Sequence, residues 1–238
     1  MLDWDNLAYI LSGGRHQTFE GYTNHIIPTL IQGTIDTMYM VGFASLFAII
    51  FGMLIGLLLY ITQPNGIHPV AFVNRFVGII VNIGRSIPFV VMIILVFPLS
   101  QHIVGTSIGR TAAIVPLTIA AIPFMSRVVE SALNELSHGI IEAATAAGAT
   151  TRQIIFRVIL PESAPALVGG FTLLIINLIT FSAMAGMVGG GGLGHLANSY
   201  GLQRHRTDIL MYVVVILVIL VQIIQGIGQM ISRKLDKR

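Results

Sequence analysis

The sequence contains no cysteine, and this absence excludes a disulfide framework and any metal site built on thiolates. Charge is also scarce, because only 10% of the 238 residues are charged, whereas soluble domains carry about 25%. Lysine occurs only at Lys234 and Lys237, so no P-loop of the form G-x-x-x-x-G-K-S/T is present. The chain is therefore not expected to bind and hydrolyse ATP itself.

Long apolar runs dominate what remains, and they predict membrane-spanning helices. Hydrophobic residues make up 55% of the chain, and one span needs about 20 apolar residues. We expect five spans, at about residues 34–61, 72–97, 111–128, 166–188 and 209–231. Within the second, residues 70–85 should form a helix near the membrane interface that bends at Pro88 into the span. The expected fold class is an all-α integral membrane protein, with Gly52 and Gly56 as a helix-packing face.

The first 32 residues differ from the rest in composition. They mix charged residues such as Arg15 and Glu20 with Pro28, which suits an external or interfacial extension. No basic region followed by an apolar run stands at the start, so we do not expect a cleavable signal peptide. The expected organisation is an N-terminal extension at 1–32 and one transmembrane domain at 33–238.

The distribution of lysine and arginine predicts the orientation of the spans. With five spans, the connecting segments alternate between the two sides of the membrane. One side receives nine basic residues: Arg75, Arg85, Arg127, Arg152, Arg157, Arg233, Lys234, Lys237 and Arg238. The other side receives four: Arg15, Arg110, Arg204 and Arg206. Because basic residues are enriched in cytoplasmic loops, the N-terminus is expected outside and the C-terminus inside.

One polar segment, at about residues 137–161, interrupts the apolar pattern on the expected cytoplasmic side. Small and helix-favouring residues predict a helix over about 137–147, ended by Gly148 in the left-handed conformation. Thr150 and Gln153 have the spacing of a capping box, which predicts a fresh helix start. The segment should therefore be a pair of short water-facing helices joined at a glycine. One face of the first helix would be exposed unless a partner covered it: Ile140, Ile141 and Ala144.

The same segment carries the pattern Glu-Ala-Ala, three residues, Gly, nine residues, then aliphatic-x-Leu-Pro. This pattern resembles the cytoplasmic loop of binding-protein-dependent ABC importer permeases, with Val158 where isoleucine is usual. In that family the loop forms a coupling helix that inserts into a groove on the ATP-hydrolysing subunit. The resemblance implies contact and hinge positions followed by a return into the membrane: Glu142, Ala143, Ala144, Gly148, Leu160 and Pro161.

Further stretches resemble the methionine-importer branch of that family, over about residues 34–231. They are NIGRSIPF (82–89), GTSIG (105–109), AAIVPLT (112–118), SAMAG (182–186) and GGLG (191–194). The resemblance implies a multi-pass protein of the bacterial plasma (inner) membrane that imports methionine, or another small amino acid or derivative. It also implies a second copy of the chain, two ABC ATPase subunits that hold ATP and Mg²⁺, and an external substrate-binding protein or lipoprotein. It implies no cofactor on this chain and no nucleic acid.

Polar side chains inside a span are costly and therefore often functional. Asn177 and Thr180 share a face of the fourth expected span, and Met184 follows one turn later. Methionine is soft and flexible, which suits a thioether ligand as well as ordinary packing. We therefore take Asn177, Thr180, Met184 and Met187 as candidate pathway-lining residues. The spans carry few acids at mid-depth, which argues against proton-coupled transport.

Other motifs allow different functions. The GTSIG stretch has the G-x-S-x-G form, so an intramembrane serine hydrolase using Ser107, with His102 nearby, is an alternative, as is a passive channel. The run GGGGLG (189–194) matches G-x-G-x-x-G but follows an expected membrane helix, which favours tight backbone turns over a dinucleotide site. His138 and Glu142 are four residues apart, but two ligands do not make a metal site. We expect neither catalytic residues nor a metal.

Overall fold

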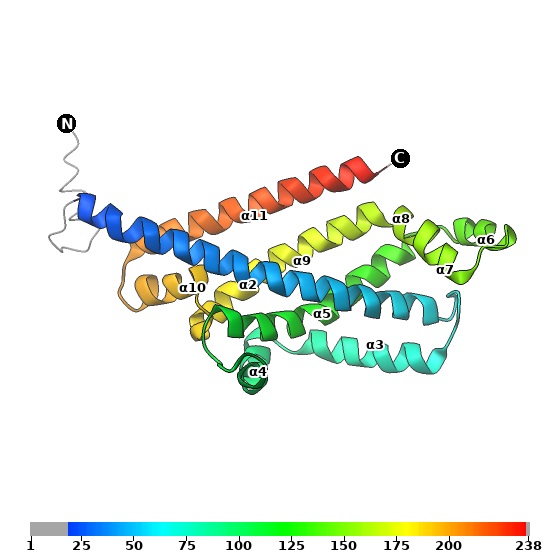
Figure 1. Ribbon diagram of the computed structural model, residues 1–238, viewed down its shortest axis with the longest axis horizontal. Coiled ribbons are helices and arrows are strands. Elements are labelled where there is room, and N and C mark those ends of the chain that lie inside the picture. The colour runs from blue at the N-terminus through cyan, green and yellow to red at the C-terminus, as the bar shows by residue number, and fades with distance from the viewer. Residues whose placement is uncertain (1–18, 237–238) are drawn as a thin grey trace. The chain divides into compact units, whose positions relative to one another are not determined.

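The computed structural model describes residues 19–236, with side chains described from residue 24 onward except that of His138. Every regular element in this range is helical, as predicted (Figure 1). The α-helices are α2 (Phe19–Thr62), α3 (Ala71–Ser86), α4 (Phe89–Val104), α5 (Arg110–Asn134), α6 (His138–Ala146), α7 (Thr151–Gln153), α8 (Leu160–Glu162), α9 (Ala164–Ala185), α10 (Gly192–Leu196) and α11 (Thr207–Leu235). Three π-helical stretches join them: η1 (Ile154–Ile159), η2 (Gly186–Gly190) and η3 (Ala197–Leu202).

Four helices in the described range are long and apolar enough to cross a membrane: Asn24–Thr62, Arg110–Asn134, Ala164–Gly190 and Thr207–Leu235. The pair α3 and α4 makes a fifth candidate, bent by 107° between the two helices. Ile87 at the break is extended, with φ −80° and ψ 123°. This conformation is the one that a following proline favours. The predicted bend at Pro88 is confirmed.

Two predicted boundaries are wrong, and both involve a proline. The first helix begins at Phe19 instead of near residue 34, with Pro28 inside it. The helix of the second expected span, α4, continues through Pro98 to Val104, where a loop was expected. Prolines are tolerated in membrane helices when other groups satisfy the freed carbonyls. Residues 1–18 lie outside the described range, so the proposed extension stays a prediction.

The chain divides into two compact units, which we describe separately. Unit 1 comprises residues 1–43, 93–117 and 178–222. Its apolar core includes a cluster from α10 and α11: Leu193, Leu196, Ile209 and Val213, none more than 7% exposed.

Unit 2 comprises residues 44–92, 118–177 and 223–238, and here α2 packs closely on α5. A Cβ atom at Gly56 would lie 2.5 Å from the backbone oxygen of Ser126, and one at Gly52 would lie 2.5 Å from Met125 Cβ. The predicted packing face at Gly52 and Gly56 is therefore confirmed. Fully buried residues of this unit include Leu59, Met125, Leu133, Ile159 and Leu174.

Candidate functional site

The polar segment 137–161 belongs to unit 2 and begins with α6, whose end is closed by its own backbone. Gly148 has φ +77°, the left-handed conformation that glycine adopts without strain. Its N–H donates to Thr145 O at 2.9 Å, and Ala149 N–H donates to Ala144 O at 3.1 Å. These two bonds form a Schellman motif, which satisfies the last carbonyls of the helix. The predicted helix end at Gly148 is confirmed.

The second half of the segment starts with a complete capping box. Thr150 Oγ1 accepts from the N–H of Gln153 at 3.4 Å, and Gln153 Oε1 accepts from the N–H of Thr150 at 2.8 Å. The predicted second helix start is therefore confirmed. Beyond it, the chain winds as the π-helix η1 and then as α8. Both of these caps are formed by residues of the segment itself.

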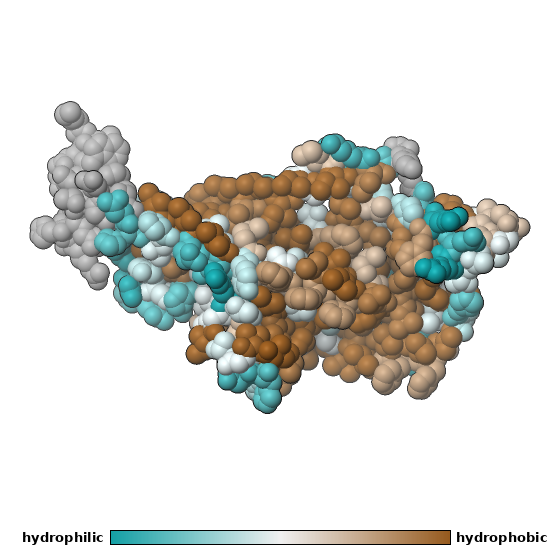
Figure 2. Space-filling view, in the orientation of Figure 1, coloured by the Kyte–Doolittle hydropathy of each residue, from teal (hydrophilic) through white to brown (hydrophobic). Residues whose placement is uncertain are grey.

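The outer surface of the segment is open. In Figure 1, α6 projects past the ends of the long helices of unit 2, and Figure 2 colours this end with a mixture of polar and apolar residues. Glu142, Ala143 and Gly148 are exposed, as is Pro161, while Ala144 and Leu160 are half-buried. Ile140 and Ile141 are half-buried too, so the chain itself covers part of the predicted apolar face. The exposed surface of the segment therefore consists mainly of small residues and carries one carboxylate, that of Glu142.

The turn between α2 and α3 supports this segment from behind. His68 Nε2 lies 2.9 Å from Thr151 Oγ1, and Gln63 Nε2 donates to Asn134 Oδ1 at 3.0 Å. A hollow of about 410 Å³ lies between the turn and α6, with Tyr60 and Glu142 among its lining residues. His68 and Gln63 gave no signal in the sequence, because their partners Thr151 and Asn134 lie 83 and 71 residues away along the chain.

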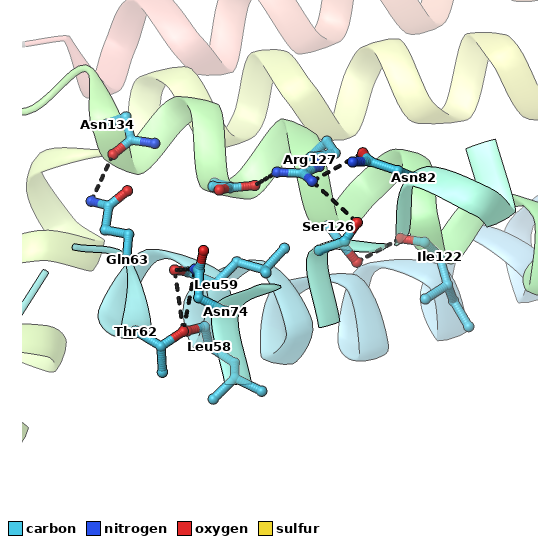
Figure 3. A network of polar contacts seen from close by, with 12 residues as sticks. Leu58, Leu59, Thr62, Gln63, Asn74, Asn82, Ile122, Ser126, Arg127 and Asn134 are labelled. Carbon is cyan, nitrogen blue, oxygen red and sulfur yellow. Dashed lines mark hydrogen bonds and ion pairs between the residues drawn. The ribbon is translucent and has the colours of Figure 1, made fainter. Parts of the chain in front are cut away.

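An arginine network joins α5 to α3 close to this support (Figure 3). Arg127 Nη1 pairs with Glu130 Oε2 at 2.5 Å, and the two side chains are only 27% and 15% exposed. Arg127 Nη2 donates to Asn82 Oδ1 at 3.0 Å and to Gly78 O at 3.4 Å. Asn74 of α3 donates to Leu59 O of α2 at 2.8 Å. Three helices of unit 2 are thus tied together by polar contacts behind the exposed segment.

The candidate pathway residues lie on α9 and η2. Asn177, in unit 2, is half-buried. Thr180, in unit 1, is exposed, and Met184 and Met187 are 37% and 53% exposed. Ser182, by contrast, is buried and donates to Ile179 O at 2.7 Å. The chain alone therefore leaves Thr180 and both methionines uncovered.

The glycine run of unit 1 folds back as tight turns and short helices. Gly189, Gly191 and Gly192 all have positive φ, and a Cβ at Gly192 would lie 2.6 Å from Thr37 Oγ1. That same hydroxyl accepts from the N–H of Leu193 at 2.9 Å. A helix precedes the run, so the tight-turn interpretation is confirmed and the strand that a dinucleotide motif needs does not occur there.

An ion pair stands near this run. Arg110 Nη1 pairs with Asp36 Oδ1 at 2.5 Å, and the guanidinium lies 5.0 Å from the Tyr39 ring centroid. The two charges meet because α2 and α5 lie side by side here. They are 74 residues apart along the chain, so the sequence gave no sign of this ion pair.

The remaining motifs do not assemble a catalytic or metal site. Ser107 Oγ donates to Phe97 O at 3.3 Å and to Gln101 Oε1 at 3.2 Å, while the His102 ring contacts Pro98 O instead. The serine hydrolase alternative is therefore unsupported. No three metal-binding side chains cluster among those that the structure describes. The predicted pair of His138 and Glu142 cannot be placed, because the His138 side chain lies outside the described residues.

Comparisons with known proteins agree with one transport family. Residues 48–237 match the family described as binding-protein-dependent transport system inner membrane component. The chain is 47% identical over 209 residues to a probable D-methionine transport system permease protein of Vibrio cholerae, covering 88% of this chain and 93% of that protein. It is 42% identical over 221 residues to the methionine import system permease protein of Bacillus subtilis, covering 92% of this chain and 100% of the relative.

A solved structure agrees with these relatives. An inward-facing methionine ABC transporter, MetNI, contains a chain that is 44% identical, with a TM-score of 0.88 over 89% of this chain and 98% of that one. A second, only 17% identical, is an amino acid ABC transporter with a TM-score of 0.75, and this likeness concerns the fold alone. From the family match, which spans most of the sequence, we conclude that the chain belongs to the inner membrane components of binding-protein-dependent transport systems.

Proposed function

We propose that this chain is the permease subunit of an ATP-driven methionine importer. The observation that carries the proposal is the match to permeases of methionine transport along 88–92% of the chain at 42–47% identity. Two copies would enclose the pathway, because five spans of one chain enclose it poorly. An external binding protein would deliver the substrate, and two partner ATPases would hold ATP and Mg²⁺.

The segment 137–161, which we now call the coupling segment, would dock on the ATPase. Its support for this role is physical: it is exposed, its two short helices carry their own caps, and small residues let a partner backbone approach closely. Glu142, Ala143 and Ala144 would make the contact, Gly148 would be the hinge, and Leu160 and Pro161 would return the chain to the membrane. Closure of the ATPases on ATP would then move both coupling segments and open the pathway outward.

Substrate would pass beside α9. A polar side chain exposed at membrane depth is costly in lipid, so Thr180 suits a wet pathway or a second copy better than a lipid contact. Met184 and Met187 offer flexible, polarisable surface to a thioether substrate, and Asn177 offers hydrogen bonds. We propose these four as pathway-lining residues.

Uptake of labelled methionine by cells that lack only this chain, with and without its restoration, tests the proposal. We expect uptake only in the restored cells, and its loss when residues 142–148 are replaced by a glycine-serine linker at matched membrane levels. Competition with unlabelled amino acids separates methionine from another small amino acid. Unchanged methionine uptake in cells without the chain would refute the substrate assignment.

A further inference from the structure

An acidic hollow lies in unit 2 where the end of α5, the junction of α8 with α9, and the end of α11 meet. It encloses about 520 Å³, and its polar lining consists of Glu135, Glu162, Ser163, Ser232 and Asp236. Glu135 and Glu162 are exposed, and neither belongs to an ion pair within the described part of the chain. Among the described residues, two accessible carboxylates thus share one cavity without a cation between them.

Ser163 provides a second, independent observation at this cavity. The residue is 2% exposed, and its Oγ has no hydrogen-bond partner within the described range. Ser126 and Thr172 of the same unit donate to the carbonyl four residues earlier, whereas the buried hydroxyl of Thr118, like that of Ser163, has no partner within the described range. Buried hydroxyls are nearly always bonded, so this wall of the hollow suits an added hydrogen-bonding group.

The size and spacing of these groups decide what kind of ligand fits. Among the side chains that the structure describes, no three carboxylates or imidazoles come close enough to hold one metal ion. A long basic side chain, in contrast, can reach carboxylates that are spread around a cavity, and its N–H groups suit carboxylate and hydroxyl acceptors. Anionic lipid headgroups would be repelled. The hollow therefore favours an arginine or a lysine.

We propose that this acidic hollow receives a basic side chain of the ATP-hydrolysing subunit, as a second contact beside the coupling segment. Pro161 and Glu162 connect the two surfaces directly, because Pro161 ends the coupling segment and both residues line the hollow. A partner docked on the coupling segment would thus have the hollow within reach. The inference rests on the proposed function, since it requires an ATPase partner.

Binding of the purified ATPase subunit to the permease reconstituted in nanodiscs tests the inference. In low salt, we expect the double variant Glu135→Gln/Glu162→Gln to bind the ATPase roughly threefold to tenfold more weakly, as the loss of two exposed ion pairs predicts. At about 0.5 M salt the difference should shrink, because the charges are then screened. The matched control Glu135→Asp/Glu162→Asp keeps both charges and should bind as the unaltered chain does. Equal binding by the Gln and Asp variants in low salt would overturn the inference.

Two further arms make the result specific. A chain ending at Asp236 lacks Lys237 and Arg238; if this truncation removes the effect of the double variant, the chain's own tail is the occupant and the inference fails. Replacement of 142–148 by a glycine-serine linker should abolish ATPase binding whether or not the hollow contributes to it. If the linker variant does not bind the ATPase while the Gln double variant binds normally, the inference about the hollow is wrong and the proposed function stands. If both variants bind normally, the inference and the proposed coupling role are both wrong.

Discussion

The left-handed backbone conformation of Gly148 ends the first helix of the coupling segment. Its φ of +77° is strained for a residue with a side chain, by about 1–2 kcal/mol, although a Cβ there would meet no atom within 4 Å. We expect Gly148→Val to loosen the Schellman motif and to lower methionine uptake at matched membrane levels. Hydrogen exchange of amides 147–149 should become faster in the same variant.

Gly139 provides the matched control for this substitution. It lies near the start of α6, the helix that Gly148 follows, meets nothing within 4 Å of an added Cβ, and has no positive φ. Gly139→Val should therefore leave exchange at 147–149 unchanged. Equal uptake by the Gly139→Val and Gly148→Val variants would contradict the hinge assignment.

Arg127 connects α5 to α3 behind the coupling segment. Removing its charge leaves the half-buried Glu130 without its ion pair and breaks the contacts to Gly78 and Asn82. We expect Arg127→Met to lower stability by about 1–3 kcal/mol, measured as a lower Tm in detergent. Arg85→Met removes an exposed arginine from the same neighbourhood and should change the Tm little. Adding Glu130→Gln to Arg127→Met should recover part of the loss; no recovery would argue against the pair.

At the scale of elements, the contact between α2 and α5 in unit 2 depends on two glycines. A Cβ at Gly56 would collide with the Ser126 backbone oxygen, which cannot rotate away as a side chain can. We expect Gly56→Ala to cost about 1–3 kcal/mol through overpacking and to lower the Tm. Gly42→Ala, on the same helix, meets no atom within 4 Å and should be neutral or slightly stabilising. A neutral Gly56→Ala would mean that the two helices can separate without loss.

The elements that the sequence predicted correctly are those with local signals. The helix end at Gly148, the capping box of Thr150 and Gln153, and the break at Pro88 each depend on a few neighbouring residues. The wrong boundaries came from assigning Pro28 to an extension before the first span and Pro98 to a loop after the second, although helices tolerate prolines in apolar surroundings. The contacts of His68 with Thr151 and of Asp36 with Arg110 depend on tertiary packing, so no spacing along the chain could reveal them.

At the scale of the whole molecule, the absence of cysteine makes the orientation directly measurable. The count of basic residues predicts that the coupling segment faces the cytoplasm and that Arg204 faces outward. In intact cells, a membrane-impermeant maleimide should label Arg204→Cys but should label Gly139→Cys only after the cells are opened. The unaltered chain, without a thiol, is the blank. Labelling of Gly139→Cys in intact cells would invert the predicted topology.

The two self-closed helices of the coupling segment have a consequence for how the importer would assemble. Disordered segments that fold on contact lose conformational freedom at that moment, and this loss weakens their affinity. Here the Schellman motif and the capping box have already ordered the backbone in the isolated chain. Docking of an ATPase on this segment should therefore resemble the meeting of two rigid bodies. Its association rate should be limited by diffusional encounter and by the orientation of the two surfaces, because no slow folding step precedes binding.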